Sequence, residues 1–196
     1  MSFHPVQLHV HRVERLPRIQ VLIRLVLVLA LGIIGWSSIY WLLYLAMPAL
    51  VAVRLSQQGP KSYFSQHAPG LVRALRWLVG AEAYLCFLTN VLPTSEGSPV
   101  DLQINLTGVP TARTALLRLV FNLPALLLVA VLTMASGFVW LLAALAALIS
   151  ERVPRALAEF LLLAIRVRFR FIAYHLSLVD RYPSLADQSV DHPVPA

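Results

Sequence analysis

The sequence predicts an all-α integral membrane protein with about four transmembrane or membrane-embedded helices, built as two tandem repeats with a small two-stranded β element. Three observations predict this fold class. The 196 residues are 59% hydrophobic and 13% charged, whereas charged residues make up about 25% of a typical soluble domain. Two long runs, 25–53 and 119–150, contain no charged residue. The pattern around these two runs occurs twice in the chain.

Both uncharged runs are long enough to cross a bilayer, since about 20 helical residues span its hydrocarbon core. Buried helices of a soluble protein are disfavoured, because too little polar sequence is present to cover two such helices. A cleaved signal peptide is also disfavoured, because the first run is too long and no small-residue cleavage site follows it. Basic residues fall in similar numbers on the two expected faces, with a weak excess that favours cytoplasmic hairpin connections.

The repeat is clearest in Arg24 to Pro60 and Arg118 to Pro154, two spans of equal length that lie 94 positions apart. Each span opens with Arg-Leu-Val, continues as an apolar run and ends in a polar patch closed by proline. We assign residues 1–94 to the first repeat and 95–184 to the second. The short polar tail, 185–196, is expected to be disordered.

A short alternating segment precedes each long helix. Pro5 to His11 reads PVQLHVH and Pro99 to Asn105 reads PVDLQIN, and both alternate apolar with polar residues. This period of two is typical of a half-buried β-strand. An isolated strand would leave its backbone groups unpaired, so we expect the two copies to pair with each other.

A second, less hydrophobic helix follows each polar patch. The first is expected from about Pro69 to Asn90 and the second from about Arg155 to Asp180, each ending shortly before a proline. The offset between the copies is here 90 positions rather than 94. In this register the matched residues include Arg76 with Arg166, Ala83 with Ala173, Tyr84 with Tyr174, and Asn90 with Asp180.

The second repeat carries the clearest motifs: Arg152-Val-Pro154-Arg155, then Arg166 and Arg170, Ala173-Tyr174, and Val179-Asp180-Arg181-Tyr182-Pro183. In these motifs the chain resembles a family of small bacterial membrane proteins known only as a domain of unknown function. Its members have a Pro-Val-x-Leu strand, a long apolar helix, and a second helix that ends in Thr-Asp-x-Tyr-Pro. The first repeat departs from this pattern, because it lacks the tyrosine before Pro93. The resemblance implies two tandem copies and a membrane location, and it implies no activity.

The second helices pose a question of placement. On a helix, Glu159, Arg166 and Arg170 share one face, and only nine residues separate Arg170 from Asp180. An amphipathic helix in the plane of the membrane and a crossing helix whose polar face meets the other repeat both remain open. The arginines can snorkel to headgroups or pair structurally. Alternatively, they line a polar site between the repeats, made by Arg76, Glu82, Tyr84, Glu159, Arg166, Arg170 and Tyr174.

No residue pattern indicates catalysis. The sequence contains no nucleophile with a matching base and acid, no Gly-rich phosphate loop and no paired cysteine ligands, so we expect no enzyme activity and no cofactor. His9 and His11 could face the same side of a strand, but their counterparts are Gln103 and Asn105, so no metal site is expected. The net charge of +7 is scattered among apolar segments, which favours anionic lipid over nucleic acid.

These features favour a multi-pass protein of the bacterial cytoplasmic (inner) membrane that acts as a non-enzymatic scaffold or accessory subunit. Its expected partners are membrane lipids, anionic ones among them, and a membrane protein or a second copy of the chain. The alternative is a small transporter or lipid-handling protein that uses an arginine-lined cleft between the repeats.

Overall fold

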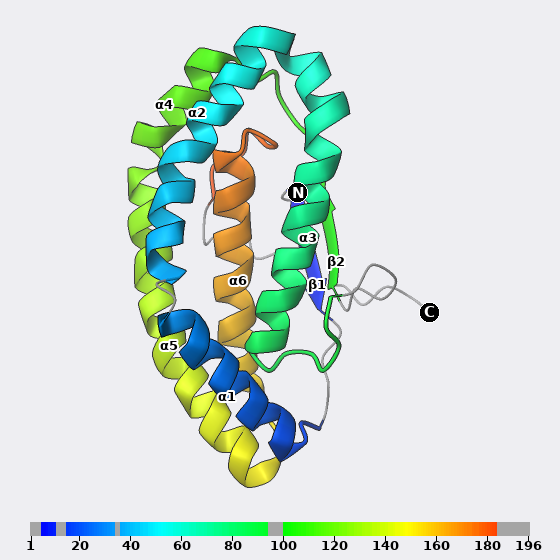
Figure 1. Ribbon diagram of the computed structural model, residues 1–196, viewed down its shortest axis with the longest axis vertical. Coiled ribbons are helices and arrows are strands. Elements are labelled where there is room, and N and C mark those ends of the chain that lie inside the picture. The colour runs from blue at the N-terminus through cyan, green and yellow to red at the C-terminus, as the bar shows by residue number, and fades with distance from the viewer. Residues whose placement is uncertain (1–4, 11–14, 34–35, 94–99, 184–196) are drawn as a thin grey trace.

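The computed structural model describes residues 5–10, 15–33, 36–93 and 100–183, and they form a mostly helical fold with a two-stranded sheet (Figure 1). The elements in order are strand β1 (Val6–Val10), helices α1 (Arg18–Ile33) and α2 (Trp36–Ser62), the π-helix η1 (Tyr63–His67), helix α3 (Ala68–Leu85), strand β2 (Val100–Ile104), and helices α4 (Ala112–Phe121), α5 (Leu123–Ser150) and α6 (Arg155–His175). The expected boundary between the two repeats, at residues 94 and 95, lies outside the described residues. The expected tail, 185–196, lies outside them as well.

The two alternating segments pair, as the sequence predicts. Strands β1 and β2 are antiparallel, with Leu8 opposite Leu102 at the centre of the ladder. The apolar side chains of both strands point into the core, so that Leu8 and Leu102 are buried while His9 and Asp101 remain exposed. The alternation of apolar and polar residues therefore sets which face of the sheet is covered.

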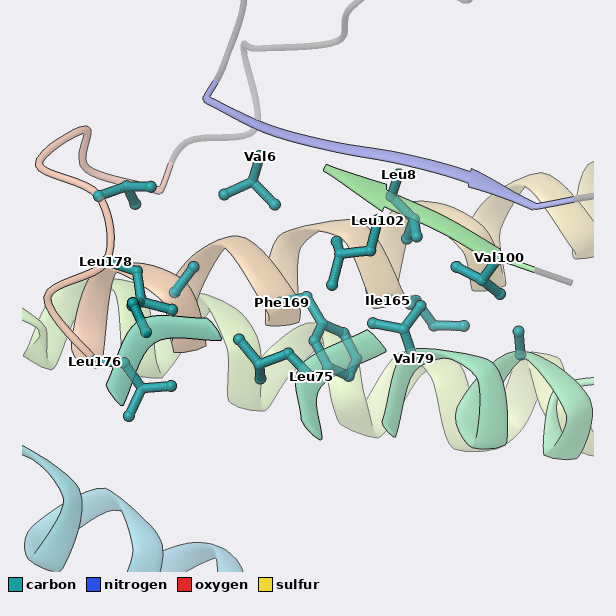
Figure 2. Close-up of a cluster of buried hydrophobic side chains, with 14 of the residues drawn as sticks. Val6, Leu8, Leu75, Val79, Val100, Leu102, Ile165, Phe169, Leu176 and Leu178 are labelled. Atoms are coloured by element: carbon teal, nitrogen blue, oxygen red, sulfur yellow. The ribbon is translucent and has the colours of Figure 1, made fainter. Parts of the chain in front are cut away.

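Helix α6 runs through the middle of the molecule (Figure 1). Helix α3 and the sheet lie on one side of it and α2, α4 and α5 on the other, while α1 lies below, alongside the end of α5. Figure 2 shows Leu75 and Val79 of α3 with Ile165 and Phe169 of α6 beneath the two strands, in one cluster of buried side chains. Burying apolar side chains of this size contributes about 1.5–3 kcal/mol each, and this cluster holds the sheet and the two second helices together.

Each long apolar run is divided between two helices. The first is split between α1 and α2. The second is interrupted at Asn122, which ends α4 and precedes α5. Pro124 lies in the first turn of α5, where its missing N–H and fixed φ favour the start of a new helix.

The polar patch after the first run is helical, although the sequence suggested a connection there. Helix α2 continues to Ser62 across a local break at Gly59, whose φ of 75° lies in the left-handed region that glycine tolerates. The π-helix η1 then leads directly into α3. In the second half, Glu151 ends α5 in a left-handed conformation and Pro154 precedes α6.

Helices α3 and α6 end with the same pattern of backbone hydrogen bonds. Leu88 N donates to Ala83 O, and Leu178 N donates to Ala173 O, both at 3.0 Å. The residue before each donor, Phe87 or Ser177, has a positive φ of about 60° (62° and 57°), as in the helix-ending motif that glycine usually makes. Both helices are therefore shorter than the sequence predicted, because the chain turns about five residues before Asn90 and Asp180.

Within the described residues, α5 is the helix that is long and apolar enough to cross a membrane. The sequence predicted about four membrane helices, and the structure supports one candidate span. The first run is divided between the 16-residue α1 and α2, and α2 ends in polar turns beyond the run. Helices α3 and α6 carry charged residues along their length.

Candidate functional site

Arg118 on α4 is buried and ties this helix to the chain that follows α6. Its guanidinium donates to the backbone oxygens of Tyr174 (2.5 Å) and Val179 (2.8 Å) and to Asp180 Oδ1 (2.5 Å). The guanidinium also stacks over the Tyr174 ring, with its carbon 4.3 Å from the ring centroid. These charge-assisted hydrogen bonds and the cation–π contact compensate the loss of hydration.

Arg24 on α1 occupies a related environment near the end of α3. It is fully buried, lies 3.9 Å from the centroid of the Tyr84 ring and donates to Asn90 Oδ1 at 2.9 Å. Asn90 in turn donates to the backbone oxygen of Arg15 at 2.9 Å. Among the residues that the structure describes, the Nε and Nη1 atoms of Arg24 have no hydrogen-bond acceptor. The partner of Arg24 is therefore the Asn90 amide, whereas the partner of Arg118 is the Asp180 carboxylate.

A third polar group joins α2, α6 and the break between α4 and α5. His175 Nδ1 lies 2.8 Å from Asn122 Nδ2, and His175 Nε2 lies 2.7 Å from the backbone oxygen of Tyr44. These partners fit a neutral imidazole that accepts at Nδ1 and donates at Nε2. The Tyr44 ring stacks on the imidazole at 4.6 Å. His175 is thus an interior histidine with both ring nitrogens satisfied.

Burial is the main influence on the titration of His175. It lowers the pKa of the imidazole below its ordinary value, with a smaller lowering from the Arg118 charge. The hydrogen bond to the Tyr44 carbonyl oxygen acts in the opposite direction. The imidazole is therefore neutral at pH 7.

Glu82 on α3 forms an ion pair with Arg168 on α6. Both side chains are mostly buried, with exposed fractions of 18% and 14%. Arg168 also donates to Thr133 Oγ1 on α5 at 3.3 Å. The pair therefore connects three helices close to the middle of α5.

The structure distributes the residues of the predicted polar site among several separate contacts. Glu82 pairs with Arg168, while Tyr84 and Tyr174 lie under Arg24 and Arg118. The remaining predicted residues lie as follows: exposed Arg76 donates to Leu102 O at 3.3 Å, Glu159 pairs with Arg155 at 2.6 Å, Arg166 is half-buried, and Arg170 is 5% exposed. That these residues act together at one site stays a prediction.

Sequence reasoning did not single out Arg24, Arg118 or Asn122. The two arginines were counted as charges that flank the apolar runs, although their equal placement at the start of both runs was a usable signal. Asn122 gave no signal, because its burial depends on the break between α4 and α5. His11 lies outside the described residues, and within them no three His, Cys, Asp or Glu side chains gather as a metal site.

Comparison with protein families matches residues 112–186 to Domain of unknown function (DUF4389). The matched segment contains α4, α5 and α6, together with Arg118, Tyr174 and Asp180. The match holds one copy, so the expected resemblance is confirmed for this part of the chain. The comparison with curated proteins found no match, and neither did the comparison with solved structures.

Proposed function

We propose that the protein is a non-enzymatic, multi-pass protein of the bacterial inner membrane that serves as a scaffold or accessory subunit. In this role it binds lipid, and a membrane protein or a second copy of itself, through the apolar faces of α1 and α5. The observation that carries the proposal is the outer face of α5. In an apolar stretch of 18 residues of α5, only 6% is buried within the molecule.

Large apolar side chains follow this face from one end of α5 to the other at intervals of three or four residues. They are Leu123, Leu127, Val131, Met134, Phe138, Leu141, Leu145 and Ile149, and we call them the α5 stripe. A stripe at helical spacing presents one continuous surface. Exposed apolar patches of this kind mark contacts with a membrane or with another protein.

We further propose that the chain is a duplication, with copies at 1–94 and 95–184. Support comes from the strand register, in which Val6 pairs with Ile104 while their counterparts, Val100 and Val10, also pair with each other. Such a ladder has a local two-fold axis between Leu8 and Leu102. The matched endings of α3 and α6 and the matched arginine clusters support the same relation.

A membrane extraction experiment tests the main proposal. In cell fractions washed with alkaline carbonate, the full chain should stay in the membrane pellet and require detergent for release. Met134→Arg should shift the chain toward the wash, because an arginine near the middle of a span costs about 2.5–3.5 kcal/mol. Ser65→Arg, at an exposed position in η1, is the matched control. This variant should stay in the membrane pellet as the wild type does. Full release of the wild-type chain without detergent would reject the membrane proposal.

The scaffold role predicts association. In mild detergent the chain should run as a homo-oligomer or as a complex by size-exclusion chromatography with light scattering. A monodisperse monomer across the accessible concentration range, in a chain that remains in membranes, would count against the scaffold while leaving the location intact.

As a second candidate function, we propose handling of anionic lipids or substrates along the arginine-bearing face of α6. The Glu82–Arg168 ion pair favours it, because charges placed beside the middle of an apolar span are uncommon and often functional. Arg166→Gln should then weaken binding of anionic lipid with folding unchanged. Exposed Arg113→Gln on α4 is the control, and equal binding by both variants and the wild type would reject this function.

A further inference from the structure

An open groove of about 420 Å³ lies where α2, η1 and the start of α3 meet the chain after α6. Its floor includes Tyr63, whose hydroxyl donates to the backbone oxygen of Leu176 at 2.6 Å. Burial raises the pKa of Tyr63 to about 12, so the phenol keeps the proton that it donates to Leu176. No part of the proposed arginine-lined site belongs to this groove.

The groove changes from apolar to polar along its length. On α2, Met47 and Leu50 line one part of it, and Arg54 lines it seven residues beyond Met47, which is about 10 Å along a helix. On the opposite wall, His67 lies before Leu71, so the polar residues of both walls are nearer the turn between the helices. Of the residues that the structure describes, no acidic one lines the groove. A ligand that fits has an apolar chain and a negatively charged head.

The groove lies close to one end of α5. Leu176, in the groove, directly follows His175, which contacts Asn122 immediately before α5 begins. Arg54 is the first charge after the long apolar run in α2. If α5 crosses a bilayer, as the proposed function requires, this end of α5 is where phospholipid headgroups lie.

We propose that this groove binds one anionic phospholipid, with an acyl chain along the apolar wall of α2 and the phosphate beside Arg54 and His67. The inference rests on the proposed membrane location, and it adds a specific ligand class and site. A zwitterionic lipid would bring its own cation close to Arg54, so the groove should select a net negative headgroup.

Native mass spectrometry of the full chain in mild detergent tests the site. With phosphatidylglycerol and phosphatidylcholine of equal chain length supplied together, the wild type should retain one phosphatidylglycerol. Gly70→Trp should lose this lipid, since Gly70 lines the groove and has open space beside it. Arg54→Gln should keep a lipid and reduce the preference for phosphatidylglycerol about tenfold, as expected for one charge-assisted contact.

Two matched variants control for size and charge. Gly137→Trp places the same side chain at an exposed, open helical position on α5, and Arg113→Gln removes a charge from exposed α4; both should bind as the wild type does. Glycerol phosphate, which lacks the chain, should not displace the lipid. Retention unaffected by Gly70→Trp, equal retention of both lipids, or displacement by glycerol phosphate would each overturn the proposal.

The experiments can reject the membrane location and the lipid site in the groove independently of each other. A chain that stays in carbonate-washed membranes but retains no phosphatidylglycerol keeps the proposed location and overturns the groove site. A chain released by carbonate that still binds the lipid at Gly70 in detergent overturns the location alone.

Discussion

A guanidinium group that leaves water needs acceptors for its N–H groups, and Arg118 and Arg24 meet this need to different extents. Arg118 has two backbone oxygens and the Asp180 carboxylate. Arg24 has the amide oxygen of Asn90 and a weaker contact with Gln20 at 3.4 Å, and two of its nitrogens have no acceptor within the described part of the chain. A buried charge without a charged partner is costly, so the Arg24 cluster is the less stable of the two.

We expect Asn90→Asp to stabilise the protein by about 1–3 kcal/mol, because it gives Arg24 the carboxylate that Arg118 already has. This gain should exceed the loss of the hydrogen bond from Asn90 to the Arg15 oxygen. Asp180→Asn should destabilise by a similar amount. Thermal unfolding in detergent measures both, and Asn105→Asp, at an exposed position, is the control. Destabilisation by Asn90→Asp would contradict this account of Arg24.

His175 should make stability depend on pH. Its folded-state pKa is lowered from an ordinary value of about 6.5, so the unfolded chain binds the proton more readily. The contribution of His175 is therefore complete above about pH 6.5 and is lost as the pH falls below it, by at most about 1.4 kcal/mol per pH unit. Melting temperatures between pH 7.5 and 5.5 should fall less steeply in His175→Gln. Equal slopes would show that His175 is not responsible.

At the scale of elements, the segment between β2 and α4 packs closely against the end of α6. Thr107 Oγ1 accepts from Asp180 N at 3.1 Å, and Gly108 has a positive φ of 86°. A Cβ on Gly108 would overlap the Asp180 carboxylate. This glycine therefore serves two purposes, the backbone conformation and the close approach.

Gly108→Ala should destabilise the protein by about 1–3 kcal/mol, because it strains the backbone and moves Asp180 away from Arg118. Chemical denaturation measures the change. Gly70→Ala is the matched control, since Gly70 is helical with open space beside it, and there alanine should stabilise by about 0.5–1 kcal/mol. A neutral Gly108→Ala variant would contradict the close packing of this segment.

The elements that were predictable from sequence are those whose signal is local. The alternation in Val6–Val10 and Val100–Ile104 was enough to predict both strands and their pairing. The ends of α3 and α6 were not predictable from sequence. Phe87 and Ser177 adopt left-handed conformations there, and only a glycine at these positions would have indicated a helix end.

The candidate site was less predictable, because it depends on which residues the helices bring together. Arg166, Arg168 and Arg170 alternate along α6, and the sequence favoured the pair that shares a face with Glu159. The structure pairs Glu82 with Arg168, a contact between two helices that the sequence does not indicate. The burial of Arg24 likewise follows from packing between helices far apart in sequence.

At the scale of the whole molecule, the structure separates a mixed interior from an apolar exterior. The interior contains the inward faces of the sheet, α3 and α6, with the arginine clusters and the Glu82–Arg168 pair. The exterior is formed largely by α1, α2, α4 and α5, which carry most of the exposed large apolar side chains. The apolar composition of the chain agrees with this exterior, and the proposed membrane location would remove it from water.

The central claim is that the α5 stripe faces lipid, and a spin label at Met134 tests it most directly. Met134 is 70% exposed and lies near the middle of α5. The label is attached to Met134→Cys in a Cys86→Ser background, in vesicles containing phosphatidylglycerol, with Ser65→Cys as the water-exposed reference. If the stripe faces lipid, oxygen, which dissolves in lipid, reaches the Met134 label far more readily than a water-soluble nickel chelate does. Equal access of the nickel chelate to the labels at positions 134 and 65 would contradict it.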